Sequence, residues 1–254
     1  MAAVGELHEV GDGIGVPVLL DGELGDGLGH RAVLAAHGQQ QRPAVLVPGV
    51  DLDRGVRGEG RGRGLEQRPG GVTEAEAPEL AASVVDWLTG EGIIAAEPAD
   101  CVLGAESGYP PGPRYAFAVR EPDERLFRLR TNGVEVCTSR AVFAPIQGEL
   151  GPVACPHCEQ TIDLEDRATG QTTPQWEAFS DALNVWMEGG PAEVCCPQCG
   201  QWAGFNDWHW ISEWPFAVGF LGFTFWNWPP LSEPFIAQMA SLLTHRVVIT
   251  QGKI

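Results

Sequence analysis

Lysine is almost absent from this chain, which has a single lysine, Lys253, among its 254 residues. The other basic residues are arginines, and the 16 basic residues stand against 34 aspartates and glutamates, for a formal net charge of −18 at pH 7. A field of that sign repels a polyanion such as DNA or RNA unless a local basic patch overrides it. Nucleic acid is therefore not an expected partner.

Long apolar runs are absent as well. No stretch of about 18 apolar residues occurs, so the sequence contains no candidate membrane span. The first 20 residues carry acidic side chains where a secretory signal needs positive charge. Both absences predict a cytoplasmic protein without a membrane partner. In that reducing compartment, seven cysteines favour metal binding over disulfides.

Residues 1–71 contain no Phe, Trp, Tyr, Cys, Ser, Asn or Lys, and they hold 17 of the 33 glycines. Segment 53–71 has no apolar periodicity, and segment 43–52 would form a short strand without a neighbouring partner. Three interpretations stay open: an Arg/Gly-rich nucleic-acid tail, a disordered tail or linker, or residues that precede a true translation start at Val72. The remaining 183 residues hold 24 acidic and 9 basic residues, so the acidity belongs to the part expected to fold.

Apolar periodicity predicts helices over residues 74–92, 174–190 and 233–245, the last with Ser232 as its N-cap. Alternation predicts strands at 115–119, 222–228 and 246–254. A hairpin is expected over residues 125–143, with a type I′ turn at Asn132-Gly133, so that residues 114–143 form an antiparallel meander.

The predicted fold class is α+β, an antiparallel sheet with a few helices and an embedded four-cysteine zinc ribbon, after about 70 disordered N-terminal residues. We expect four parts along the chain. They are 1–71, a disordered or non-native extension; 72–150, an α+β part with the hairpin meander; 151–212, a zinc-ribbon module with an inserted helix; and 213–254, an aromatic strand–helix–strand that completes the fold.

Two Cys-Pro-x-Cys pairs, Cys155/Cys158 and Cys196/Cys199, are separated by 37 residues. Each turn places two sulfurs on one side of a tight loop, and two such turns face to face give four thiolates around Zn²⁺ at about 2.3 Å. Four sulfur ligands leave no position for water or substrate, so the expected metal is structural zinc, with iron as a minor alternative. The other three cysteines are expected to be spare thiols: Cys101, Cys137 and Cys195.

These pairs resemble the zinc-ribbon knuckle, Cys-Pro-x-Cys-Gly, over residues 153–203, and the resemblance implies a metal-binding module without an activity. Glu159 stands where the first knuckle often has the glycine that Gly200 supplies in the second. A rival interpretation is that Cys155-Pro-His-Cys158 matches the active-site tetrapeptide of DsbA-type thiol oxidases, in which the motif opens a helix. Residues 159–170 lack a helical apolar stripe, which favours the metal.

Asp207 and His209 are expected on one face of a strand, with Glu213 nearby. The favoured interpretation is an aromatic ladder with incidental polar residues on its outer face, and the alternative is an acid–base pair or a second metal site. The aromatic residues between Trp202 and Trp228 either fill a core or line a ligand pocket. The sequence predicts a protein-interaction or adaptor protein with a structural zinc site. A small-molecule binder or enzyme using the Asp207/His209 region is the alternative, and a zinc-ribbon nucleic-acid binder is third.

Overall fold

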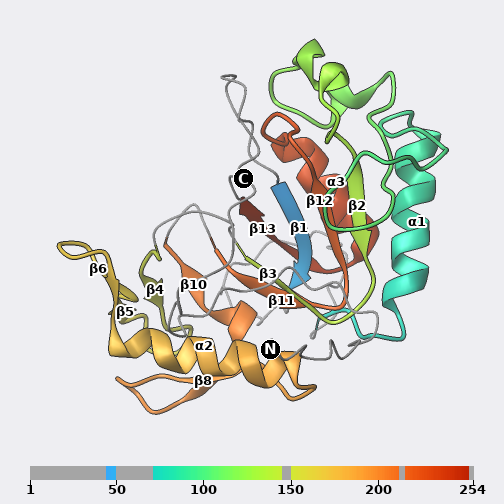
Figure 1. Cartoon of the computed structure of the whole chain (residues 1–254). Coiled ribbons are helices and arrows are strands. Elements are labelled where there is room, and N and C mark those ends of the chain that lie inside the picture. The colour runs from blue at the N-terminus through green and yellow to red at the C-terminus, as the bar shows by residue number, and fades with distance from the viewer. Residues whose placement is uncertain (1–43, 50–70, 145–149, 212–214, 252–254) are drawn as a thin grey trace, which may run out of the picture.

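The computed structural model describes residues 44–49, 71–144, 150–211 and 215–251 of the chain. It has the expected α+β architecture, with antiparallel sheets and three α-helices (Figure 1). The helices α1 (Ala77–Gly90), α2 (Pro174–Met187) and α3 (Glu233–Leu243) confirm the three predicted ones. The backbone N–H of Phe235 donates to the Ser232 hydroxyl, which confirms that N-cap. Disorder was expected for residues 1–71. Of these, the structure describes only residues 44–49 and 71, and the others lie outside the described part.

The main sheet has four antiparallel strands in the order β13 (Arg246–Gln251), β1 (Ala44–Gly49), β12 (Gly222–Phe225) and β2 (Val134–Cys137). Helices α1 and α3 lie side by side against one face of it (Figure 1). The core between them joins Leu88 of α1 and Phe235 of α3 to Phe223 and Phe225 of β12, all of them buried. These residues are apolar side chains that the sequence places at helical or alternating spacing, and their burial fixes the sheet against the helices.

The second half of the fold is built from short strands around α2. They are β3 (Ala141–Phe143) with β11 (Ala217–Gly219); β10 (His209–Trp210), β4 (Val153–Ala154) and β5 (Thr161–Ile162) in that order; β6 (Glu165–Asp166) with β7 (Gln171–Thr172); and β8 (Glu193–Cys195) with β9 (Trp202–Gly204). Three 3₁₀ helices complete the described elements: η1 (Tyr115–Phe117), η2 (Glu124–Arg128) and η3 (Phe205–Asp207). Helix α2 packs against β8 and β3 and covers the region that holds the paired cysteines.

The hairpin predicted over residues 125–143 is wrong. Strand β2 pairs with β12, β3 pairs with β11, and residues expected in strands form η1 and η2 instead. Gly133 does not have a positive φ, and both Asn132 and Gly133 donate backbone N–H groups to the Cys101 carbonyl oxygen. A Cβ atom at Gly133 would collide with the Cys101 sulfur, so the glycine is needed for close packing rather than for a tight turn.

Strand β1 lies in the segment for which no strand partner was expected, and its partners come from the far end of the chain. It pairs with β13 over six residues and with β12 over three. Val47 is fully buried and packs with Phe143 and Ala217 on the sheet face opposite the helices. The pairing crosses more than 170 residues, a separation at which local sequence gives no signal.

Replacing Val47 with Asp tests the contribution of β1. A carboxylate in this buried apolar position is expected to lower the free energy of unfolding by about 3 kcal/mol or more. Urea unfolding measures the free energy of unfolding of this variant. A second protein, a chain that begins at Val72 and so lacks β1, is measured in the same way. If both proteins are as stable as the full chain, β1 has no part in the fold, and a translation start at Val72 gains support.

Arg140 joins the two halves of the described structure. Its guanidinium donates to the carbonyl oxygens of Trp186 and Gly190, at 2.8 and 2.9 Å, and lies 4.0 Å from the centre of the Trp186 ring and 4.9 Å from that of Phe220. The Trp186 indole in turn donates to the Ala141 carbonyl oxygen at 3.0 Å. A cation at the C-terminal end of α2 also complements the helix dipole. The end of α2 is thereby tied to β3.

Candidate metal centre

The two Cys-Pro-x-Cys turns have nearly the same local structure. The first connects β4 to β5, and the second connects β8 to β9. In each, the N–H after the second cysteine donates to the carbonyl oxygen of the first: Glu159 to Cys155 at 3.0 Å and Gly200 to Cys196 at 2.8 Å. A short antiparallel pair therefore closes each turn and presents both of its sulfurs on one side.

The four predicted ligands, Cys155, Cys158, Cys196 and Cys199, converge. Their Sγ atoms all lie within 4.8 Å of one another. The Cys155–Cys199 and Cys158–Cys196 sulfur pairs are each 3.8 Å apart, and none of the seven cysteines forms a disulfide. A tetrahedron with metal–sulfur bonds of about 2.3 Å has edges of about 3.8 Å. The donor set therefore fits a metal ion such as Zn²⁺ or iron with four sulfur ligands.

The first cysteine of each turn is buried and the second is partly exposed. Burial raises the pKa of the Cys155 thiol. Burial also acts to raise the pKa of Cys196, but backbone N–H groups of Cys199 and Gln198 and the neighbouring thiols outweigh it, and the pKa falls to about 7. Four thiolates this close repel one another, so full ionisation of the set requires a cation between them.

An apolar core packs against the two cysteine turns. Phe179 of α2, Phe205 and Trp208 are buried. Phe205 and Trp208 each contact the Phe179 ring edge to face, with ring centres 5.9 and 4.9 Å from its centre. The same core includes Cys155 and Cys196 themselves. The inserted helix α2 thus accounts for the long spacing between the pairs, because it supplies one wall of this core.

Glu159 and Gly200 occupy equivalent positions, and both have left-handed backbone, with φ of 59° and 71°. The backbone at Glu159 is therefore strained, since the left-handed region costs a residue with a Cβ about 1–2 kcal/mol. A Cβ built at Gly200 meets nothing within 4 Å, so only the backbone angle would oppose a side chain there.

Exchanging these two residue types makes a matched pair of tests. Glu159→Gly is expected to raise the free energy of unfolding by about 0.5–1 kcal/mol, because relief of the left-handed strain exceeds the added entropy of the unfolded chain. Gly200→Ala should lower it by a similar amount. Urea unfolding at saturating zinc measures both. A destabilising Glu159→Gly would show that the Glu159 side chain, rather than its backbone, supports the turn.

The structure disfavours the thiol-oxidase interpretation of Cys155–Cys158, because the pair is followed by a strand, β5, rather than by the helix that the motif opens in that family. Without a helix N-terminus at the pair, the electrostatic feature that activates the thiol in that family is missing. Cys195 and Cys137 are half-buried and lie outside the four-sulfur group. Cys101 is buried, donates to the Gly108 carbonyl oxygen, and has its pKa raised by burial. All three lie outside the four-sulfur group, but only Cys101 has the burial that was expected of an isolated small hydrophobic residue.

The Asp207/His209 pair does not share a strand face as predicted. Asp207 ends η3, whereas His209 is exposed on β10, and Glu213 lies outside the described residues. Trp226 and Trp228, which belong to the aromatic set for which a core and a ligand pocket were the two interpretations, are buried. Their indole N–H groups donate to Glu135 and to the Asn132 carbonyl oxygen, both at 2.7 Å. The aromatic residues here fill a core.

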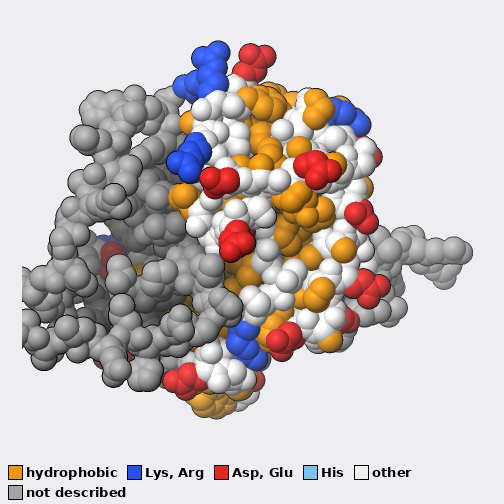
Figure 2. Space-filling view, turned by 45° about the vertical axis from the view of Figure 1, so that its right-hand side comes forward, with side chains coloured by type: hydrophobic (Ala, Val, Ile, Leu, Met, Phe, Trp, Pro, Cys, Tyr) orange, Lys and Arg blue, Asp and Glu red, His pale blue; other side chains and the backbone are white. Residues whose placement is uncertain are grey.

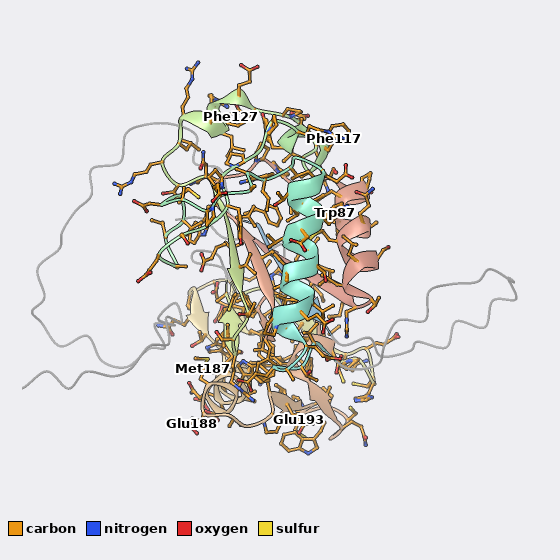
Figure 3. The ribbon with its side chains drawn as sticks, turned by 90° about the vertical axis from the view of Figure 1, so that its right-hand side faces the viewer. Trp87, Phe117, Phe127, Met187, Glu188 and Glu193 are labelled. Atoms are coloured by element: carbon orange, nitrogen blue, oxygen red, sulfur yellow. The ribbon has the colours of Figure 1, made fainter. Side chains whose placement is uncertain are left out.

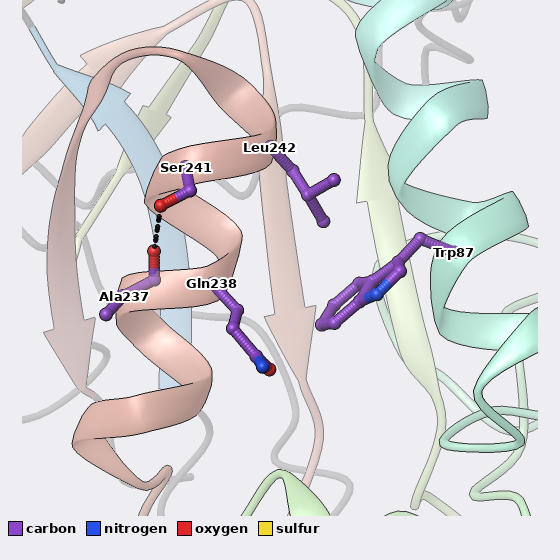
Figure 4. A pocket seen from close by; sticks show the side chains of 5 residues that line it. All are labelled: Trp87, Ala237, Gln238, Ser241 and Leu242. Carbon is purple, nitrogen blue, oxygen red and sulfur yellow. Dashed lines mark hydrogen bonds between the residues drawn. The ribbon is translucent and has the colours of Figure 1, made fainter. Parts of the chain in front are cut away.

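Two hollows of the described structure lie elsewhere. An open groove of about 390 Å³ runs between α1 and α3, lined by Trp87, Ala237, Gln238, Ser241 and Leu242 (Figure 4). A smaller apolar hollow of about 220 Å³ lies beside the second cysteine turn, under α2. Neither hollow brings together a nucleophile, an acid and a base.

The site and fold define an α+β protein with a four-cysteine centre that suits a metal ion. Comparison with known protein families, curated proteins and solved structures finds no match to this chain. Among the described residues, no helix is both long enough and apolar enough to cross a bilayer.

Proposed function

We propose that the four cysteines hold one structural Zn²⁺. The observation that supports this most strongly is the pair of 3.8 Å sulfur–sulfur distances, which match the edge of a zinc–thiolate tetrahedron. Four thiolates fill the coordination shell, so the ion has no open position for a substrate. Its contribution is to folding: it fastens β4–β5 to β8–β9, whose cysteine pairs are separated by 37 residues in sequence.

We further infer that the protein acts in the cytoplasm by binding another protein, as an interaction or adaptor protein. Trp226 and Trp228, for which a ligand pocket was the alternative interpretation, are core residues, which removes the main support for a small-molecule site there. Nine large hydrophobic side chains are exposed among the described residues, among them Trp202 at 64% beside the second cysteine turn. Exposed aromatic side chains that the fold holds in place are typical of protein interfaces.

Native mass spectrometry of the tagged full chain, isolated gently from its own cells at native abundance, tests this role. The proposal predicts a complex in which the 27.3 kDa chain carries one zinc ion and a second, different polypeptide in defined stoichiometry. A free chain that retains a small organic molecule would contradict the proposal and favour the alternative, a ligand-binding protein or enzyme. A chain that retains nucleic acid would favour the third interpretation.

A further inference from the structure

The arginines of the folded part are concentrated in one short segment. Five of the eight arginines after residue 71 lie within residues 114–130. Residues 99–131 hold five acidic and five basic residues, whereas the rest of residues 72–254 holds 19 acidic and 4 basic ones. This segment is therefore neutral by itself, on an otherwise strongly acidic protein. An acidic partner meets less repulsion from this segment than from the rest of residues 72–254.

The same segment exposes large apolar side chains. Four of the nine exposed hydrophobic residues noted above belong to residues 103–129: Leu103 at 61%, Phe117 at 64%, Phe127 at 50% and Leu129 at 40%. Phe117 and Phe127 lie at the same end of the molecule, far from Met187 (Figure 3). Basic side chains border hydrophobic ones at this end in the space-filling view (Figure 2). We call residues Arg114, Phe117, Arg120, Arg125, Phe127, Arg128 and Leu129 the arginine–phenylalanine surface.

The fold holds these side chains in position. Phe127 contacts the buried Tyr115 edge to face, with ring centres 5.0 Å apart, and Leu126 between its exposed neighbours is fully buried. The Arg114 guanidinium lies 4.4 Å from the centre of the Phe117 ring. An aromatic residue fixed before binding loses little side-chain entropy when a partner covers it.

Most arginines of this surface form ion pairs that a partner carboxylate can replace. Arg114, Arg120 and Arg125 pair with Glu91, Glu233 and Asp123 at 3.3, 3.7 and 2.7 Å, and every arginine in these pairs is at least half exposed. Arg128 has no ion-pair partner within 4.0 Å among the described residues. Exposed pairs contribute little to stability, so exchanging one carboxylate for another costs little.

We propose that the arginine–phenylalanine surface docks a protein segment that combines acidic with large apolar side chains. Arginine binds carboxylates through two parallel hydrogen bonds, and the phenylalanines supply apolar contact area. Single-stranded nucleic acid fits less well. Its binding depends on net positive charge, whereas here five acidic residues balance five arginines. This inference deepens the proposed interaction role and rests on it.

A random 12-residue peptide display library, selected for binding to the full-length zinc-loaded chain, tests the proposal. We expect enrichment of peptides that contain both acidic and aromatic or aliphatic residues. In fluorescence anisotropy, the best peptide should bind the Phe117→Ser/Phe127→Ser variant roughly tenfold or more weakly. It should also bind Arg128→Glu more weakly, with the loss greatest at low salt. Met187→Ser, exposed to 49% at the other end of the molecule, is the matched control and should bind like the unchanged chain.

Three results would overturn the proposal. They are the enrichment of no peptide or of basic peptides, equal binding by the double serine variant, and tighter binding of a 20-residue oligo(dT) than of the best peptide at the same salt concentration. The substituted side chains are all exposed, so circular dichroism should show an unchanged fold. The proposed adaptor role would survive failure here if the isolated native complex contains a second polypeptide that cross-links to another face.

Discussion

Replacing Cys155 with serine is expected to release the metal and unfold the half of the protein around α2. Serine is a poor zinc ligand, and a structural zinc site contributes on the order of 10 kcal/mol of apparent binding free energy that is coupled to folding. The change also places a hydroxyl at a position that is 1% exposed, within an apolar core. Zinc content per chain and urea unfolding measure the two effects.

Cys195→Ser provides the matched control for this prediction. It makes the same substitution at the last residue of β8, at a half-buried thiol that lies next to Cys196 in sequence and outside the four-sulfur group. We expect it to retain zinc at the level of the unchanged chain and to lose at most about 1 kcal/mol of stability. If both serine variants behave alike, the metal site does not hold this part of the fold together.

Replacing Trp228 with alanine should lower the free energy of unfolding by about 3–5 kcal/mol. This indole is 1% exposed, contacts the rings of Tyr115 and Phe225 at centre distances of 6.0 and 5.3 Å, and donates to the Asn132 carbonyl oxygen at 2.7 Å. Its removal leaves a cavity and a carbonyl oxygen without its donor. Urea or thermal unfolding of the zinc-loaded chain measures the change.

Trp202→Ala is the control for the tryptophan test, because Trp202 is 64% exposed. It should change stability by no more than about 0.5 kcal/mol. Similar costs at the two positions would contradict the assignment of Trp228 to the core and of Trp202 to the surface. A stable Trp228→Ala chain would instead support the alternative in which this tryptophan lines a ligand pocket.

Local sequence was sufficient for the helices and for the cysteine turns. Each helix has an apolar stripe and a proline in its first turn, and Ser232 caps the third as expected. The cysteine turns are equally local, because the ligand spacing, the proline and the following residue together set the turn. The left-handed conformation of Glu159 follows from its place in the same pattern.

Long-range pairing was beyond local sequence. The Asn132-Gly133 dipeptide is typical of a tight hairpin, yet its partners are the Cys101 carbonyl oxygen and the Trp228 indole, which lie far from it in sequence. Strand β1 likewise pairs with strands that are encoded near the opposite end of the chain. At Asn132-Gly133 tertiary contacts override the local preference for a hairpin. At β1 they supply the strand partners that local sequence does not reveal.

The arginine–phenylalanine surface was missed for a different reason. Net charge averages over the whole chain, and the value of −18 hides five arginines within 17 residues. The residues expected to form a strand at 115–119 form η1, which leaves Phe117 exposed instead of packed in a sheet. A count of charge by segment would have found the arginines, but the exposure of the phenylalanines required the fold.

X-ray absorption spectroscopy at the zinc edge, together with metal analysis of the purified full chain, is the sharpest test of the four-cysteine zinc centre. We expect one zinc ion per chain, bound by four sulfur atoms at about 2.3 Å. A chain that folds without stoichiometric zinc or iron, or a metal whose ligands are mainly nitrogen or oxygen, would contradict it.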